Sequence, residues 1–136
     1  MFGAVLSGAA LFGAAGGIAA ASTLPTTGTS ISWTVLPARN ICGVRRKFSG
    51  AIRLFDFDFA RLEEIGDGDA IASAEISQAR LSGAGELTLG DVAIVNGAKV
   101  KFAIAEGTAW SMHRLTCVAE TALGRTLIGV GHLFIN

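Results

Sequence analysis

The stretch that decides the fold is residues 91–105, DVAIVNGAKVKFAIA, within a β-rich region from Asp69 to Asn136. Its centre, Asn96-Gly97, favours the positive φ angles that a two-residue type I′ turn requires. The run after the turn alternates two lysines with three large apolar side chains: Lys99 and Lys101 against Val100, Phe102 and Ile104. A period of two with charges on one side is typical of a half-buried antiparallel strand. The stretch therefore predicts a β-hairpin.

Two further alternating runs, residues 110–120 and 127–135, follow the hairpin and are joined by a predicted turn at Gly124-Arg125. The last run alternates glycine with larger apolar residues, which indicates that a ring or a backbone packs closely against one of its faces. Residues 70–76 and 85–89 also have the pattern of strands. Turn signals thus recur about every 8–12 residues, the spacing of a sandwich or a barrel.

Residues 51–59 alternate strongly and place Phe55, Phe57 and Phe59 on one face. Three aromatic side chains on one side of a strand indicate a core position. Residues 31–35 form a shorter alternating run that is stopped by Pro37, and we expect this strand to join the sheet of its own domain or that of a neighbour.

Three segments carry a resemblance: residues 66–74 (GDGDAIASA), residues 107–109 (GTA) and residues 113–126 (HRLTCVAETALGRT). They resemble a family of small immunoglobulin-like domains of bacteriophage virion proteins, often called fiber-tail adaptors. The resemblance covers roughly residues 55–136. His113 and Cys117 depart from the family pattern, in which an aromatic residue and a small polar residue are common at these positions.

The expected fold class is all-β: an immunoglobulin-like antiparallel β-sandwich over residues 39–136, preceded by an uncharged N-terminal arm and linker over residues 1–38. Residues 1–21 are apolar and rich in alanine and glycine. They fit a secretory signal without its basic start, a weakly apolar membrane span, or an arm buried between subunits. A membrane anchor usually has aromatic or basic residues near both ends, and here the first base is Arg39, which favours the arm.

Charge is segregated along the chain, with five bases and no acid in residues 39–53, and six acids with one base in residues 54–69. These blocks are either a self-complementary contact surface, which sets register and specificity, or ordinary solvated loops. Apolar arm residues, the aromatic residue of the short strand and part of the basic block are the predicted partner-binding residues: Phe2, Leu6, Leu11, Phe12, Ile18, Trp33, Arg45, Arg46 and Lys47.

The sequence contains no catalytic or metal-binding pattern. Cys42 and Cys117 form at most one disulfide and have no zinc spacing, and neither histidine has a triad setting. The four aspartates of residues 56–69 do not match the helix-loop-helix calcium pattern, which leaves a plain acidic turn or, as the alternative, a calcium site in a loop between strands. No phosphate-binding loop is present. We therefore expect no enzyme activity, cofactor or metal, and the zero net charge argues against nucleic-acid binding.

The resemblance implies a non-enzymatic structural subunit of a tailed-phage particle, which joins tail, fibre, baseplate or capsid components. Its partners would be other virion proteins and further copies of itself, and its location would be the virion. The alternative is a membrane-anchored or exported immunoglobulin-like binding domain held by residues 1–21, and only this alternative includes a membrane partner.

Overall fold

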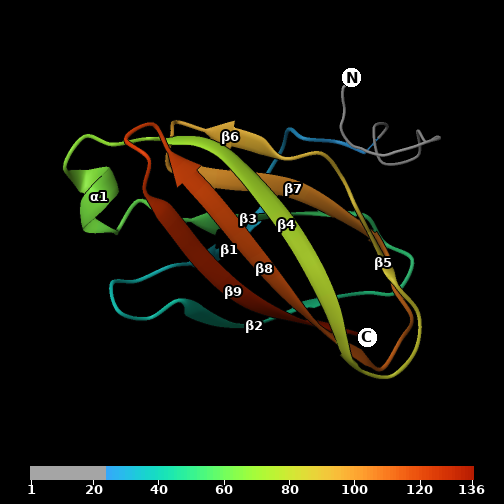
Figure 1. Ribbon diagram of the computed structural model, residues 1–136. Helices are drawn as coiled ribbons and strands as arrows, with labels where there is room; N and C mark the ends of the chain where they lie inside the picture. The colour runs from blue at the N-terminus through green and yellow to red at the C-terminus, as the bar shows by residue number, and fades with distance from the viewer. Residues whose placement is uncertain (1–23) are drawn as a thin grey trace.

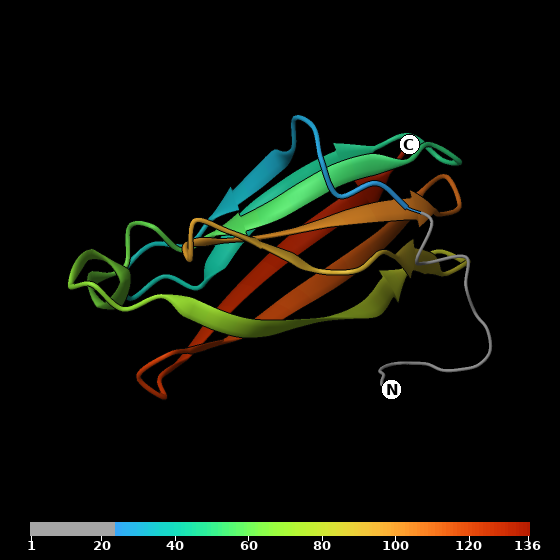
Figure 2. The same cartoon turned by 90° about the horizontal axis from the view of Figure 1, so that it is seen from above.

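The computed structural model describes residues 24–136 and shows two β-sheets packed face to face (Figures 1 and 2). Nine strands and one short helix follow one another in this described part of the chain: β1 (Ile31–Thr34), β2 (Ile41–Lys47), β3 (Arg53–Asp58), α1 (Glu63–Gly66), β4 (Ile71–Ser82), β5 (Leu87–Leu89), β6 (Ala93–Val95), β7 (Lys99–Glu106), β8 (Ser111–Thr121) and β9 (Thr126–Ile135). The prediction of an all-β sandwich is confirmed.

The two sheets are mixed, and the prediction of an antiparallel sandwich is wrong in this respect. One sheet has the order β1-β3-β7-β5, with β6 also paired to β7, and the other has the order β2-β9-β8-β4. β1 pairs with β3 in parallel, and so does β2 with β9. The first pairing is parallel because β2 lies in the opposite sheet. The chain therefore crosses between the sheets twice before β3 returns beside β1 in the same direction.

The hairpin predicted at Asn96-Gly97 is confirmed. Both residues have positive φ, of 54° and 65°, and the amide of Ala98 donates to the carbonyl of Val95 at 3.1 Å. The register of β6 and β7 places Val95 opposite Lys99, so the turn includes Ala98 as an additional residue. The predicted alternation of β7 is also confirmed, because Val100, Phe102 and Ile104 are all fully buried.

β8 and β9 supply one wall of the core, as their alternation predicts. The inward side chains of β8 are His113, Leu115, Cys117 and Ala119, and all four are fully buried. The glycines of β9 face bulky groups: a Cβ on Gly131 would lie 2.5 Å from the Trp33 ring, and one on Gly129 would lie 2.8 Å from Val35. The predicted close packing against this strand is therefore confirmed.

The phenylalanines of β3 and Phe59, the residue after it, form the opposite wall, and Trp33 of β1 joins them. Phe55, Phe57 and Phe59 are fully buried, which confirms the core prediction. Trp33 stacks on Phe55 and Phe57 with ring centroids 5.1 Å and 5.0 Å apart. β1 therefore belongs to the sandwich of its own chain, and the sandwich begins before residue 39, where the composition placed the boundary.

Residues 24–30 run across the outer face of the β1-β3-β7 sheet (Figure 2). The hydroxyls of Ser30 and Ser32 donate to the Asp56 carboxylate, and the ammonium of Lys101 donates to the Gly28 carbonyl at 2.5 Å. This cover buries Asp56, which the alternation of β3 places on the outward face. A buried carboxylate requires such partners, so this part of the predicted linker is fixed to its own domain.

Candidate protein-binding surfaces

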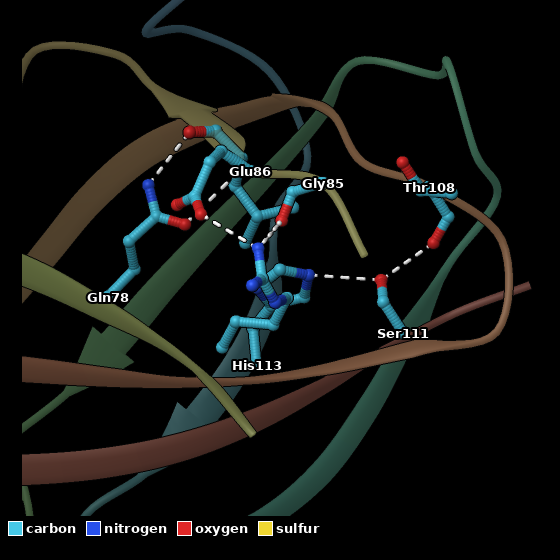
Figure 3. Close-up of polar contacts among 8 residues, drawn as sticks. Gln78, Gly85, Glu86, Thr108, Ser111 and His113 are labelled. Carbon is cyan, nitrogen blue, oxygen red and sulfur yellow. Dashed lines mark hydrogen bonds and ion pairs between the residues drawn. The ribbon is translucent and has the colours of Figure 1, made fainter. Parts of the chain in front are cut away.

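A polar cluster lies where the β4–β5 and β7–β8 loops meet (Figure 3). The Ser111 hydroxyl donates to the Thr108 carbonyl at 2.6 Å and lies 3.0 Å from Nε2 of His113. Because its proton points to Thr108, the hydroxyl accepts from Nε2–H and is not oriented as a nucleophile. Nδ1 of His113 is buried without a partner, and burial lowers the pKa of this histidine. These contacts tie the start of β8 to the β7–β8 loop.

Side chains of β4 connect this strand to the following loop and to β5 in the opposite sheet. The Gln78 amide accepts from the Leu87 N–H at 3.2 Å and donates to the Leu87 carbonyl at 2.7 Å, as a neighbouring strand would. Arg80 donates to the Gly85 carbonyl at 3.1 Å and pairs with the Glu86 carboxylate at 3.0 Å (Figure 3). These bonds hold the loops at this end of the sandwich in defined positions.

Two of the three predicted basic partner-binding residues have internal roles. Lys47 is only 3% exposed, and its ammonium donates to the carbonyls of Phe48 at 3.0 Å and Glu106 at 2.5 Å. Burial lowers the pKa of Lys47, while the nearby Glu106 carboxylate acts in the opposite direction. Arg45 donates from Nε to the Ser32 carbonyl at 3.0 Å and so covers the open edge of β1. Arg46 is exposed, 5.8 Å above the Phe134 ring.

Trp33 and the arm residues differ in where they fall. Trp33 is fully buried, because its indole packs between β3 and Gly131. Its ring is therefore not at the surface of the described sandwich. The other predicted arm residues lie outside the described residues: Phe2, Leu6, Leu11, Phe12 and Ile18. Within residues 24–136, no helix is long and apolar enough to cross a membrane.

Internal hydrogen bonds hold two of the six acids of the acidic block. Asp56 is buried against serine hydroxyls, and Asp69 accepts from the amides of Ala70 at 2.8 Å and Leu123 at 3.2 Å. Burial alone would raise the pKa of Asp69, but these hydrogen bonds, Thr121 and the Arg125 guanidinium together lower it. Among residues 24–136 no ion pair joins the basic block to the acidic block. The acids left at the surface surround α1.

The described residues hold no group of three potential metal ligands. Cys42 and Cys117 are free thiols, and burial raises the pKa of Cys117 to about 12. β9 lies between their strands β2 and β8, which places the two strands about 9–10 Å apart, too far for a disulfide.

One end of the sandwich exposes large apolar side chains. We call it the aromatic end and define it by Phe48, Ile52, Leu81 and Trp110. Trp110 is 76% exposed and stands edge-on to Phe134 with centroids 5.9 Å apart. Its φ of 69° is unusual for a residue other than glycine, and its amide is held by the Ile135 carbonyl at 2.7 Å. Sequence reasoning missed this surface, because it placed Trp110 at the start of a strand.

The opposite end, beside α1, carries a hollow of about 370 Å³. We call it the α1-end hollow, and its lining comes from the β1–β2 loop, the residue before α1 and the start of β9: Val35, Leu36, Ala38, Arg39, Asn40, Leu62, Thr126, Leu127 and Ile128. A second depression of about 400 Å³ lies on the outer face of β4 and β8 and includes Glu75, Val118 and Glu120.

A β-sandwich that exposes large apolar side chains at both ends has the features of a protein-binding module. Comparison with known families makes this specific. The chain belongs to the podophage GP4 fiber-tail adaptor protein gp77 family, and the match covers residues 47–129. This is a family of structural phage-tail proteins, so the resemblance seen in the sequence is confirmed. A search of curated proteins finds no match.

Proposed function

We propose that this protein is a non-enzymatic adaptor subunit of a tailed-phage particle, located in the virion, that joins fibre components to the tail. One observation carries the proposal: the family match runs from the last residue of β2 to the fourth residue of β9. The matched region therefore lies within the sandwich and does not include the apolar N-terminal segment. Because the side chains of Gln78, Arg80 and Lys47 hold its loops in place, the sandwich acts in this proposal as a rigid body with binding surfaces.

The sandwich is, in this proposal, immunoglobulin-like. The orders β1-β3-β7-β5 and β4-β8-β9 follow the A-B-E-D and C-F-G strand orders of that fold, with β2 as an additional edge strand. The parallel pairing of β1 with β3 is the departure from this pattern. Such a body suits a mechanical joint, because its two ends are formed by loops on a fixed scaffold.

The N-terminal segment supplies a second attachment in this proposal. Residues 1–23 contain no charged side chain. An apolar segment of this kind gains affinity by burial against a neighbouring virion protein, at about 25 cal/mol per Å² before the costs of association. Its predicted anchors are Phe2, Leu6, Leu11, Phe12 and Ile18.

The experiment is genetic deletion followed by complementation. Particles that lack this protein should have tails without fibres by negative-stain electron microscopy, and the full chain should restore the fibres. A chain without residues 1–23 keeps every residue of the described sandwich, and we expect it to accumulate as a folded protein but to fail in fibre attachment. Particles with a normal fibre complement in the absence of the protein would refute the adaptor function.

A further inference from the structure

We propose that copies of this chain bind one another head to tail, with the aromatic end of one copy docked in the α1-end hollow of the next. The occupant of the hollow is thus Trp110 of a second copy. Four observations carry this inference: an exposed indole on a constrained turn, an apolar hollow, the distance between them, and the charges beside each.

Trp110 is suited to be an anchor. Tryptophan and arginine dominate the energetics of protein interfaces, and here the exposed indole rests on Phe134 with Arg46 above the same ring. The backbone at Trp110 has a φ that glycine adopts without strain, yet the position carries the largest side chain. Strain of this kind is frequent at binding sites, where the surrounding structure fixes the residue.

The α1-end hollow is suited to receive it. Its walls include Leu36, which is 37% exposed, and Ile128, which extends the apolar surface along β9. Arg39 also lines the hollow, so a guanidinium is available beside an incoming indole, a favourable cation–π arrangement.

Trp110 does not reach the hollow of its own chain. β9 begins at Thr126 in the hollow and ends at Ile135, whose carbonyl binds the Trp110 amide. This strand of ten residues spans about 30 Å, so the two surfaces lie at opposite ends of the sandwich, as α1 and the C-terminus do in Figure 1. The contact must therefore be intermolecular and heterologous, and repetition produces a ring or a filament.

The charges beside the two surfaces are complementary. Arg46 and Arg53 lie at the aromatic end, where β2 ends and β3 begins. Glu63, Glu64 and Asp67 lie in and after α1. Arg39 and Arg61 also lie at the α1 end, but Arg46 and Arg53 are separated from these acids by the length of β3 and can meet them only between molecules. Pairing of this kind sets orientation and association rate, and it weakens at high salt.

The test uses the full chain and complementary variants in analytical ultracentrifugation. Trp110→Ala removes the anchor, and Leu36→Arg blocks the hollow; each should weaken self-association by about 30-fold, the effect of losing an interface anchor. Val44→Ala is the matched control, because Val44 is 51% exposed on β2, away from both surfaces. An equimolar mixture of the two variants should form dimers and nothing larger, because each retains one intact surface.

The inference is overturned if the full chain stays monomeric at all concentrations, or if Trp110→Ala associates as the Val44→Ala control does. It is also overturned if the mixture forms no dimers while circular dichroism shows both variants folded. Should Leu36→Arg unfold, Ile128→Arg blocks the hollow from β9 instead. Fibre attachment is a separate readout. If the protein is monomeric but particles still require it for their fibres, the head-to-tail contact is refuted and the adaptor function is not.

Discussion

The substitution Gly131→Ala is the sharpest test of how β1 is integrated into the core. Gly131 lies on β9 opposite the indole of Trp33, and a Cβ there would meet three ring atoms at 2.5–2.7 Å. Ordinary contact begins at 3.4 Å, so the ring would have to retreat by about 0.9 Å. It has no room to do so, because Trp33 is fully buried and stacked on Phe55 and Phe57.

The expected cost follows from this geometry. Overpacking of a filled core costs about 1–3 kcal/mol, and occasionally more. A rigid indole with stacked aromatic partners belongs at the upper end, so we expect Gly131→Ala to lower the free energy of unfolding by about 3 kcal/mol. For a domain of this size that corresponds to a fall in Tm of about 10–15 °C.

Urea unfolding followed by circular dichroism measures the change. Gly66→Ala is the control, because no atom lies within 4 Å of a Cβ at Gly66 and its φ is not positive. Trp33→Phe in the Gly131→Ala background should recover part of the loss, since the smaller ring leaves space for the methyl group. If Gly131→Ala unfolds at the same urea concentration as the unsubstituted protein, Trp33 does not pack on β9 and the account of β1 is wrong.

Three further predictions concern buried polar groups. His113 has a lowered pKa in the folded protein, so below about pH 6.5 its imidazole takes up a proton more readily in the unfolded chain. The free energy of unfolding should therefore fall toward about pH 5, and His113→Leu should reduce this pH dependence in urea unfolding at several pH values. Asp69 also has a lowered pKa, so its contribution to the free energy of unfolding is present near neutral pH and is lost below about pH 4. Asp69→Asn should reduce the loss of stability at acidic pH in the same series of urea measurements. Lys47→Met leaves two carbonyls without their donor and should cost about 2 kcal/mol in thermal unfolding, and an unchanged Tm would contradict the role assigned to Lys47.

Strands with clean alternation were predictable from sequence. β3, β7, β8 and β9 each pair a buried row with an outward row, and the glycines of β9 signalled the ring that packs on them. β2 was missed because its alternation is broken at Gly43, where φ is 96° and the register shifts between Ile41 and Val44. A bulge of this kind removes the period of two that identifies a strand.

The pairing of the strands was harder to predict from the sequence than their positions. Residues 31–35 have the pattern of a strand, but nothing local states which strand they join or in which direction. The burial of Asp56 was also hidden, because it depends on Ser30 and Ser32 arriving from a distant part of the chain. Such long-range cover turns an outward position into a buried one without changing the local pattern.

The candidate surfaces show the same limit. Composition identified the basic block but not that Lys47 is buried within it, while Arg46 remains exposed above an aromatic ring. The aromatic end was missed because it combines three parts of the chain, residues 48–52, 81–86 and 106–110. Only Trp110 offers a local signal, a large aromatic residue directly after a Gly-Thr-Ala corner.

Cryo-electron microscopy of the native particle tests the adaptor function most directly. The account predicts density for this two-sheet sandwich at the junction between tail and fibre, with both neighbours in contact with its surfaces. A map in which that junction is complete without the sandwich, and in which the chain lies elsewhere or is missing from the particle, would contradict it.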